Sequence, residues 1–342
     1  MIRAIENEVN LRKTYLANQP LETIYFGGGT PSILTKDEMQ SILNTIKENF
    51  QLADQLEFTI EANPDDIHTE ALKCWKALGV NRLSIGLQSF REEDLKWMNR
   101  AHTSQEALNC VKLAQQEGFE NISVDLIYGL PNLSLEEWKQ NIQTVIDMHV
   151  PHVSAYCLTV EEKTALHKMV KNHTIKPANE EEQSDQFETL VEMLALAGLE
   201  QYEISNFSKI GLHAVHNSNY WKGKHYLGIG PSAHSFDGKS RSWNIANNQQ
   251  YIKKIKENEE WFETEILSKE NQFNELLLVG LRTKFGVDYQ RLKSIMTLPV
   301  SFENKLNDFI SNNWVTLNND TIQLTQEGKL KADHIASELF VV

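Results

Sequence analysis

The chain has 342 residues, of which 41% are apolar and 23% are charged, a composition typical of a soluble globular protein with more than one domain. Its net charge of −14 argues against nucleic acid and anionic lipid headgroups as partners, because an acidic surface repels both. No apolar run approaches the roughly 20 residues of a membrane-spanning helix. The charged N-terminus is unlike a signal peptide, so we expect a cytoplasmic protein.

The three cysteines, Cys74, Cys110 and Cys157, lie far apart and form no CxxC pair. Thiols in this pattern are typical of a reduced intracellular protein. They also exclude a contiguous cysteine motif that could hold zinc or an iron–sulfur cluster.

The first predicted element is an amphipathic helix over residues 2–17, and no strand precedes it. It is either an extra helix packed outside a sheet, or the first helix of a β/α series that has lost its initial strand and loop. Beyond it, β-rich runs alternate with stretches of helical period, which predicts a parallel sheet in a barrel or a doubly wound fold. The β-rich runs cover residues 23–29, 57–64, 81–90, 121–131, 152–160 and 201–207.

Two of the intervening helices carry clear start signals. Thr35 with Glu38, and Ser134 with Glu137, fit the capping-box pattern, in which a hydroxyl residue is followed three positions later by Glu. We therefore expect helices that begin directly after Thr35 and Ser134.

Three consecutive glycines, residues 27–29, follow the first β-rich run in "TIYFGGGTPSILT". A phosphate-binding P-loop would need a lysine here, and the loop has none. A dinucleotide fingerprint would need a small residue opening a helix, but Pro31 removes a backbone donor at that point. Two interpretations remain: a bare backbone that a ligand approaches closely, or a tight turn between strand and helix.

Polar residues stand where most of the β-rich runs end. In parallel α/β folds the carboxyl ends of the strands meet at one mouth, and ligands bind there. One such residue could be a helix cap or a paired core charge, but one per successive strand favours a binding site. The residues are Glu61, Gln88, Asp125, Tyr156, Thr159 and Glu203.

Residues 208–250 lack a regular period and are rich in histidine, glycine, asparagine and aromatic residues. The uncharged stretch "YLGIGPSAHS" is of a kind that packs against a flat apolar ligand. For each histidine, a buried structural role remains the alternative. The histidines are His213, His216, His225 and His234.

Residues 270–342 predict helices followed by a hairpin in "TLNNDTIQL", which is the pattern of a winged-helix module. From residue 271 onward there are 7 Lys and Arg residues against 8 Asp and Glu. The module therefore lacks the basic face that DNA binding requires, and we expect a structural or partner-facing role.

Seven motifs occur in an order and spacing that resemble one known family: "YFGGGTPS", "EANP", "NRLSIGLQSF", "VDLIYGLP", "YEISNF", "HNSNYW" and "YLGIGPSAHS". The chain resembles the oxygen-independent coproporphyrinogen oxidase group of radical S-adenosylmethionine (SAM) proteins, and within it the HemW-type haem chaperones. The resemblance covers nearly the whole chain. It implies a partial (β/α) barrel that lacks its first strand, followed by a small winged-helix-like domain. The implied domains are residues 1–207 for the barrel, 208–269 for a segment that completes the core, and 270–342 for the C-terminal module.

The resemblance also implies a role for particular residues. His216, in "HNSNYW", is the implied haem ligand, and an imidazole can coordinate haem iron directly. A sulfonium and an ammonium group favour carboxylates, whereas an arginine suits the carboxylate of SAM. The implied SAM-binding residues are Gly28, Gly29, Thr30, Glu61, Gln88, Arg100 and Asp125.

Members of this family carry a CxxxCxxC loop that holds a [4Fe–4S] cluster, and this chain has no such motif. We interpret the orphan N-terminal helix and the missing cysteines together as the loss of the first strand and the cluster loop. Chemistry that depends on the cluster is therefore not expected from this chain as written, and whether it is an enzyme stays open.

The resemblance favours a chaperone that binds haem and SAM and delivers haem to an acceptor protein. One alternative is an oxygen-independent coproporphyrinogen III oxidase, which decarboxylates its substrate by radical chemistry. A more distant alternative is a metal-dependent barrel hydrolase that uses Glu61, Asp125 and histidines.

Overall fold

The computed structural model describes residues 1–341 and divides into two compact units. The first unit comprises Met1–Ile24, Thr35–Leu56 and Ala214–Val342, and the second comprises Tyr25–Leu34 and Glu57–His213. Strands β1 (Leu21–Phe26) and β2 (Leu52–Ala62) each run from the first unit into the second. Within the described residues, no helix is long and apolar enough to cross a bilayer.

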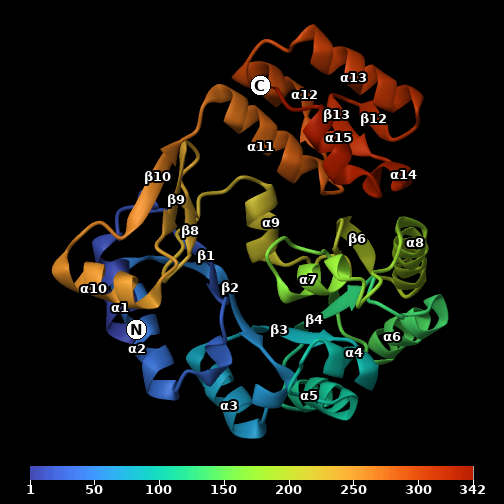
Figure 1. Cartoon of the computed structure of the whole chain (residues 1–342). Helices are drawn as coiled ribbons and strands as arrows, with labels where there is room; N and C mark the ends of the chain where they lie inside the picture. The colour runs from blue at the N-terminus through green and yellow to red at the C-terminus, as the bar shows by residue number, and fades with distance from the viewer. Residues whose placement is uncertain (342) are drawn as a thin grey trace. The chain divides into compact units, whose positions relative to one another are not determined.

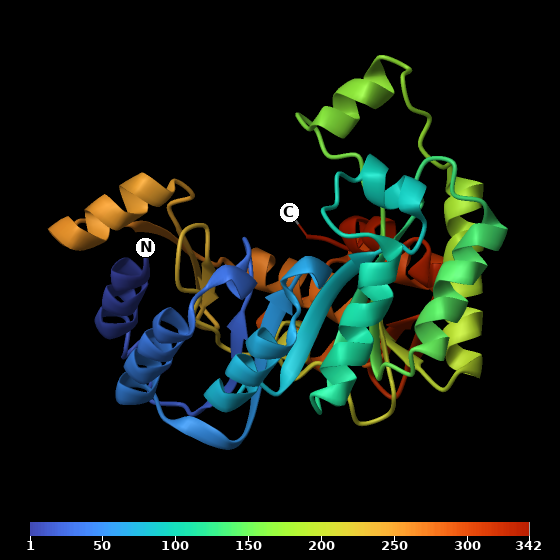
Figure 2. The ribbon, with the colours of Figure 1, turned by 90° about the horizontal axis from the view of Figure 1, so that it is seen from below.

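The main sheet has seven strands in the order β1-β2-β3-β4-β5-β7-β6 (Figure 1). The four strands from β2 to β5 are parallel neighbours in sequence order, as the alternation of runs predicts. In the second unit, helices cover the outer face of this curled sheet (Figures 1 and 2), so the partial barrel is confirmed. Its strands and helices are β3 (Arg82–Gln88), β4 (Asn121–Tyr128), β5 (His152–Cys157), α3 (Thr69–Leu78), α4 (Glu92–Trp97), α5 (Ser104–Gln116), α6 (Leu135–Asp147), α7 (Ala165–Lys171) and α8 (Glu180–Leu196), with the short 3-10 turns η1 (Pro31–Ile33) and η2 (Pro64–Asp66).

The last β-rich run differs from the prediction of one more parallel strand. It forms two short strands, β6 (Glu200–Glu203) and β7 (Asn206–Ser208), which pair antiparallel with each other. Strand β7 also pairs antiparallel with β5. The carboxylate of Glu203 closes the turn by accepting hydrogen bonds from the Ser205 N–H at 2.9 Å and the Asn206 side chain at 2.6 Å. A polar residue predicted to lie in the site therefore holds a turn.

Both predicted capping boxes are present. Thr35 caps α2 (Lys36–Asn49) with Glu38, and Ser134 caps α6 with Glu137. Helix α1 (Ile2–Leu11) is shorter than predicted, because the chain leaves the helix at Arg12. Ala17 and Asn18 then take positive φ angles of 49° and 60°, which a helix cannot contain.

Helix α1 is anchored in the first unit by Glu8, whose side chain is completely buried. One carboxylate oxygen accepts hydrogen bonds from a backbone N–H and a phenol, and the other accepts them from an amide and an indole. Its partners are the Gly230 N–H at 2.8 Å, Tyr251 Oη at 2.5 Å, Asn244 Nδ2 at 2.7 Å and Trp261 Nε1 at 3.0 Å, with Arg12 Nη1 at 3.8 Å.

The segment expected to be irregular is more ordered than its sequence suggests. It contains α9 (Val215–Trp221), β8 (His234–Phe236) and β9 (Ser240–Asn244). These two strands form an antiparallel sheet with β10 (Phe262–Ile266), which lies beyond residue 250 and follows α10 (Asn248–Glu257). The carboxylate of Asp237 accepts hydrogen bonds from the N–H groups of Lys239 and Ser240, and so forms the turn between β8 and β9. The sequence of this segment shows no regular period because short polar strands have little hydrophobic alternation to detect.

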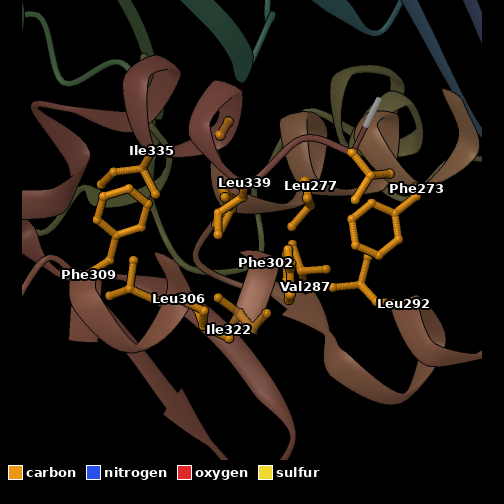
Figure 3. Packing of buried hydrophobic residues seen from close by; sticks show 14 residues of the cluster. Phe273, Leu277, Val287, Leu292, Phe302, Leu306, Phe309, Ile322, Ile335 and Leu339 are labelled. Carbon is orange, nitrogen blue, oxygen red and sulfur yellow. The ribbon is translucent and has the colours of Figure 1, made fainter. Parts of the chain in front are cut away.

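The C-terminal module has the predicted helices followed by a hairpin, and the structure adds a two-residue strand between the first two helices. Its three strands pair in the order β11-β13-β12, and its helices enclose a core that includes Phe273, Leu292 and Phe302 (Figure 3). Asn319 and Asp320 form the hairpin turn with φ angles of 49° and 60°, the conformation that Asn and Asp tolerate best after glycine. The elements are α11 (Lys269–Leu281), β11 (Val287–Asp288), α12 (Tyr289–Ile295), α13 (Val300–Ser311), β12 (Val315–Asn318), β13 (Thr321–Leu324), α14 (Gln326–Lys329) and α15 (Ala332–Glu338).

Candidate functional site

The polar residues predicted at the strand ends occupy three adjacent strands of the second unit. Glu61 lies one residue before the end of β2, Gln88 ends β3, and Asp125 lies within the carboxyl half of β4. The strands are parallel neighbours, so these side chains belong to the same edge of the sheet, where ligands of α/β folds bind. Tyr156 lies near the end of β5 and is 45% exposed, whereas Thr159 follows that strand.

The glycine loop is held against Glu61. One carboxylate oxygen accepts a hydrogen bond from the Gly28 N–H at 2.9 Å, and the other accepts one from the Tyr25 hydroxyl at 2.6 Å. Gly28 and Gly29 have φ angles of +70° and +67°, and no atom lies within 4 Å of where a Cβ would stand on either residue. The loop therefore offers open, exposed backbone of the kind that a ligand can approach. Thr30 is exposed beside it and precedes η1.

Gly27 and Tyr25 belong to this arrangement, although the sequence reasoning did not single them out. A Cβ on Gly27 would stand 2.3 Å from the Tyr25 ring and 2.7 Å from a Glu61 carboxylate oxygen. Contacts this short do not occur in proteins, so any side chain at residue 27 would force Tyr25 and Glu61 to move. Tyr25 lies two positions before Gly27 on β1, a period-2 relation that could have indicated the contact.

Gln88 and Arg100 meet around Gly86. Gln88 has a positive φ of 71°, and the pairing of β3 with β4 shifts register between Ile85 and Gln88. Arg100 donates from Nη2 to the Asn63 side-chain oxygen at 2.7 Å and to the Gly86 carbonyl at 3.0 Å. Its Nε is buried and has no hydrogen-bond partner in the protein. A buried donor without a partner is rare in folded proteins.

Asp125 has an unusually basic carboxyl group. Burial, with a further contribution from the negative charge of Glu61, raises the pKa of Asp125 to about 7. Arg82, Arg100 and the hydroxyl of Ser154 act in the opposite direction. Desolvation of its hydroxyl group and the charge of Asp125 also raise the pKa of Tyr156 to about 12.

A cavity of about 590 Å³ opens beside Gln88 and Arg100 within the second unit. No sequence pattern indicates this cavity, because its apolar walls come from separate parts of the chain, and each of these side chains alone is typical of a hydrophobic core. The other lining residues are Trp97, Met98, Ile127, Leu158, Leu166, Met169, Thr174 and Ile175.

His216 lies on α9 in the first unit. Its Nδ1 is 2.8 Å from the Thr23 hydroxyl oxygen, and the Tyr220 ring packs edge to face with the imidazole at a centroid distance of 5.0 Å. Burial lowers the pKa of His216 to about 4, so the ring is neutral at pH 7.

The other histidines of this segment have separate surroundings. His213 belongs to the second unit, where its Nε2 is 2.9 Å from a Glu200 carboxylate oxygen and its ring stacks on Tyr202 at 4.4 Å. His225 and His234 are exposed. His213 and His216, three positions apart in the sequence, thus have different partners.

The cysteines do not fit an iron–sulfur cluster. Cys74 lies on α3, Cys110 on α5 and Cys157 at the end of β5, and burial raises the pKa of Cys110 to about 12. Across residues 1–341, the structure contains no group of three His, Cys, Asp or Glu side chains arranged to hold a metal ion. No mechanistic step can therefore be assigned to a cluster, or to a hydrolytic metal, on the residues present.

The comparisons with known proteins agree with this fold. The family model "Radical SAM superfamily" matches residues 2–145, and "HemN C-terminal domain" matches residues 267–330. Among solved structures, coproporphyrinogen III oxidase (HemN) from Escherichia coli, described as a radical SAM enzyme, superposes with a TM-score of 0.84 at 22% identity, covering 99% of this chain and 82% of that one. At this identity the match establishes the fold alone.

Curated relatives narrow the family. "Heme chaperone HemW" of Bacillus subtilis is 32% identical over 338 residues, which is 98% of this chain and 89% of the relative. "Heme chaperone HemW" of Haemophilus influenzae is 30% identical over 343 residues, covering 100% of this chain and 88% of the relative. The chain therefore belongs to the radical SAM superfamily and, within it, to the HemW haem chaperone family.

Proposed function

We propose that this protein binds haem through His216 and delivers it to an acceptor protein. The observation that carries the proposal is the setting of this imidazole. Thr23 holds Nδ1, which orients Nε2 as the nitrogen that would meet the iron, and aromatic residues stand beside the ring. Tyr220 in turn packs against Tyr226 at 4.5 Å, so the histidine stands at an aromatic cluster suited to a porphyrin.

The second part of the proposal is a SAM site in the other unit. Glu61 and Asp125 would meet the positive charges of SAM, and Arg100, whose Nε lacks a partner, would meet its carboxylate. The backbone of Gly28 and Gly29 would lie against the methionine portion. The apolar cavity beside Gln88 would take the adenine ring. These residues supply binding and orientation; reductive cleavage of SAM would require the cluster that the chain's cysteines do not fit.

A haemin titration of the purified protein tests the first part. We expect a shift of the Soret band that saturates at one haemin per chain. Replacing His216 with alanine should weaken binding at least tenfold, which corresponds to about 1.4 kcal/mol. His225→Ala is the matched control, because His225 is an exposed histidine of the same segment and should leave the titration unchanged. A Soret shift that survives His216→Ala at full affinity would exclude His216 as the ligand.

A further inference from the structure

Asp125 is connected to a buried network of hydrogen bonds inside the sheet. It is the direct cross-strand neighbour of Ser154 on β5, whose hydroxyl acts to lower the pKa of Asp125. The Ser154 hydroxyl donates to Asn206 Oδ1 at 3.1 Å, and its oxygen lies 3.4 Å from the hydroxyl of Ser123. The Ser123 hydroxyl in turn lies 2.7 Å from His152 Nδ1. None of the groups in this network carries a positive charge, since burial keeps the pKa of His152 well below its usual value.

The direction of these bonds determines what Asp125 can receive. Asn206 donates its amide hydrogens to Glu203 at 2.6 Å, so its oxygen must face Ser154. A serine hydroxyl has one hydrogen, and here Asn206 takes it. An ionised Asp125 would therefore have to take that hydrogen and leave a buried amide oxygen without a donor. A protonated Asp125 needs no hydrogen from Ser154 and leaves the bond between Ser154 and Asn206 intact.

The charged groups around Asp125 do not reverse this preference. Glu61 on β2 is a like charge. The side chain of Arg100 is committed to the neutral oxygens of Asn63 and Gly86, and that of Arg82 donates to Asn121. The remaining titratable groups that face Asp125 are the phenols of Tyr25 and Tyr156, both neutral at pH 7. Arg82 and Arg100 lower the pKa of Asp125, but they do not outweigh burial and the charge of Glu61.

We propose that Asp125 carries a proton in the ligand-free protein and releases it to solvent when a cationic ligand of the SAM class binds. The neutral carboxyl group becomes a carboxylate that faces the ligand's positive charge. Each protein molecule in which Asp125 was protonated therefore releases one proton when it binds the ligand. This inference rests on the proposed SAM site and adds that its occupancy depends on pH. A protonated carboxyl cannot form an ion pair, so acid weakens binding.

Calorimetric titration with SAM, in buffers of different ionisation enthalpy, measures the proton directly. With a carboxyl pKa of about 7, release of roughly half a proton is expected at pH 7, and SAM should bind about tenfold more weakly at pH 6 than at pH 8. Asp125→Asn should remove both the buffer dependence and the pH dependence. Asp185→Asn, an exposed aspartate on α8, should keep both. Equal heats in all buffers for the unmodified protein would overturn the proposal.

Infrared spectroscopy of the ligand-free protein tests the protonation of Asp125 independently of ligand binding. The unmodified protein should show the infrared band of a protonated carboxyl group at pH 6 and lose it by pH 8. Asp125→Asn should lack this band. Asn206→Ala should release the Ser154 hydrogen and move this titration to lower pH, with a thermal melt to verify folding. Asp125 already ionised at pH 6 would refute the proposal. If SAM produces no heat in any buffer, the proposed SAM site fails, while the infrared titration still decides the protonation of Asp125.

Discussion

Glu8→Ala is expected to lower the free energy of unfolding of the first unit by about 3–5 kcal/mol, the range observed when a buried, hydrogen-bonded charge network is broken. The substitution leaves four buried donors without an acceptor: the Gly230 N–H, Asn244 Nδ2, Tyr251 Oη and Trp261 Nε1. It also leaves the guanidinium of Arg12 buried without its acidic neighbour. Urea denaturation, followed by tryptophan fluorescence, measures the loss.

Two further variants distinguish the loss of the Glu8 hydrogen bonds from the effect of replacing any glutamate on a helix. Glu8→Gln keeps the shape of the side chain but places an amide NH₂ against groups that are themselves donors. It should therefore still lower the free energy of unfolding by about 1–3 kcal/mol. Glu48→Ala, an exposed glutamate on α2 in the same unit, should change stability by less than about 0.5 kcal/mol. A Glu8→Ala protein as stable as Glu48→Ala would show that the buried carboxylate is not needed to hold α1.

Much of the second unit could be predicted because its signals are local. The parallel strands are short apolar runs that carry Glu61, Gln88 and Asp125 in their carboxyl halves. In each capping box, of α2 and of α6, the two capping residues are three positions apart. The two-residue turn likewise depends on two adjacent residues, Asn319 and Asp320, both of which tolerate a positive φ. Each of these features depends on neighbours in sequence, so periodicity and residue type were sufficient.

The features that sequence reasoning missed depend on residues far apart in the chain. A glutamate in the helical pattern of α1 reads as a solvent-facing charge, because its four donors lie more than 200 positions away. Glu203 was assigned to the mouth by position alone, whereas it closes the turn between β6 and β7. The cavity beside Arg100 has walls from five separate segments, and no single segment reveals it.

The role of residue 27 follows from the same kind of contact and gives the second large expected effect. Gly27→Ala should weaken SAM binding at least tenfold. Its Cβ would stand 2.3 Å from the Tyr25 ring and 2.7 Å from the Glu61 carboxylate, and both side chains would have to move. Moving Glu61 breaks its hydrogen bonds to Tyr25 and to the Gly28 N–H, so the carboxylate and the loop lose their shared position. Equilibrium binding of SAM to the two proteins measures the change.

Gly198→Ala is the matched control for this substitution. Gly198 belongs to the same unit and has a positive φ of 80°, but no atom lies within 4 Å of the added Cβ. Backbone strain should therefore lower the free energy of unfolding of this variant by about 1 kcal/mol. The substitution does not contact the proposed SAM site, so the SAM affinity should be unchanged. If both variants lose SAM binding equally, general destabilisation is the cause. If Gly27→Ala binds SAM as tightly as the unmodified protein, the contact between the loop and Glu61 does not shape the ligand site.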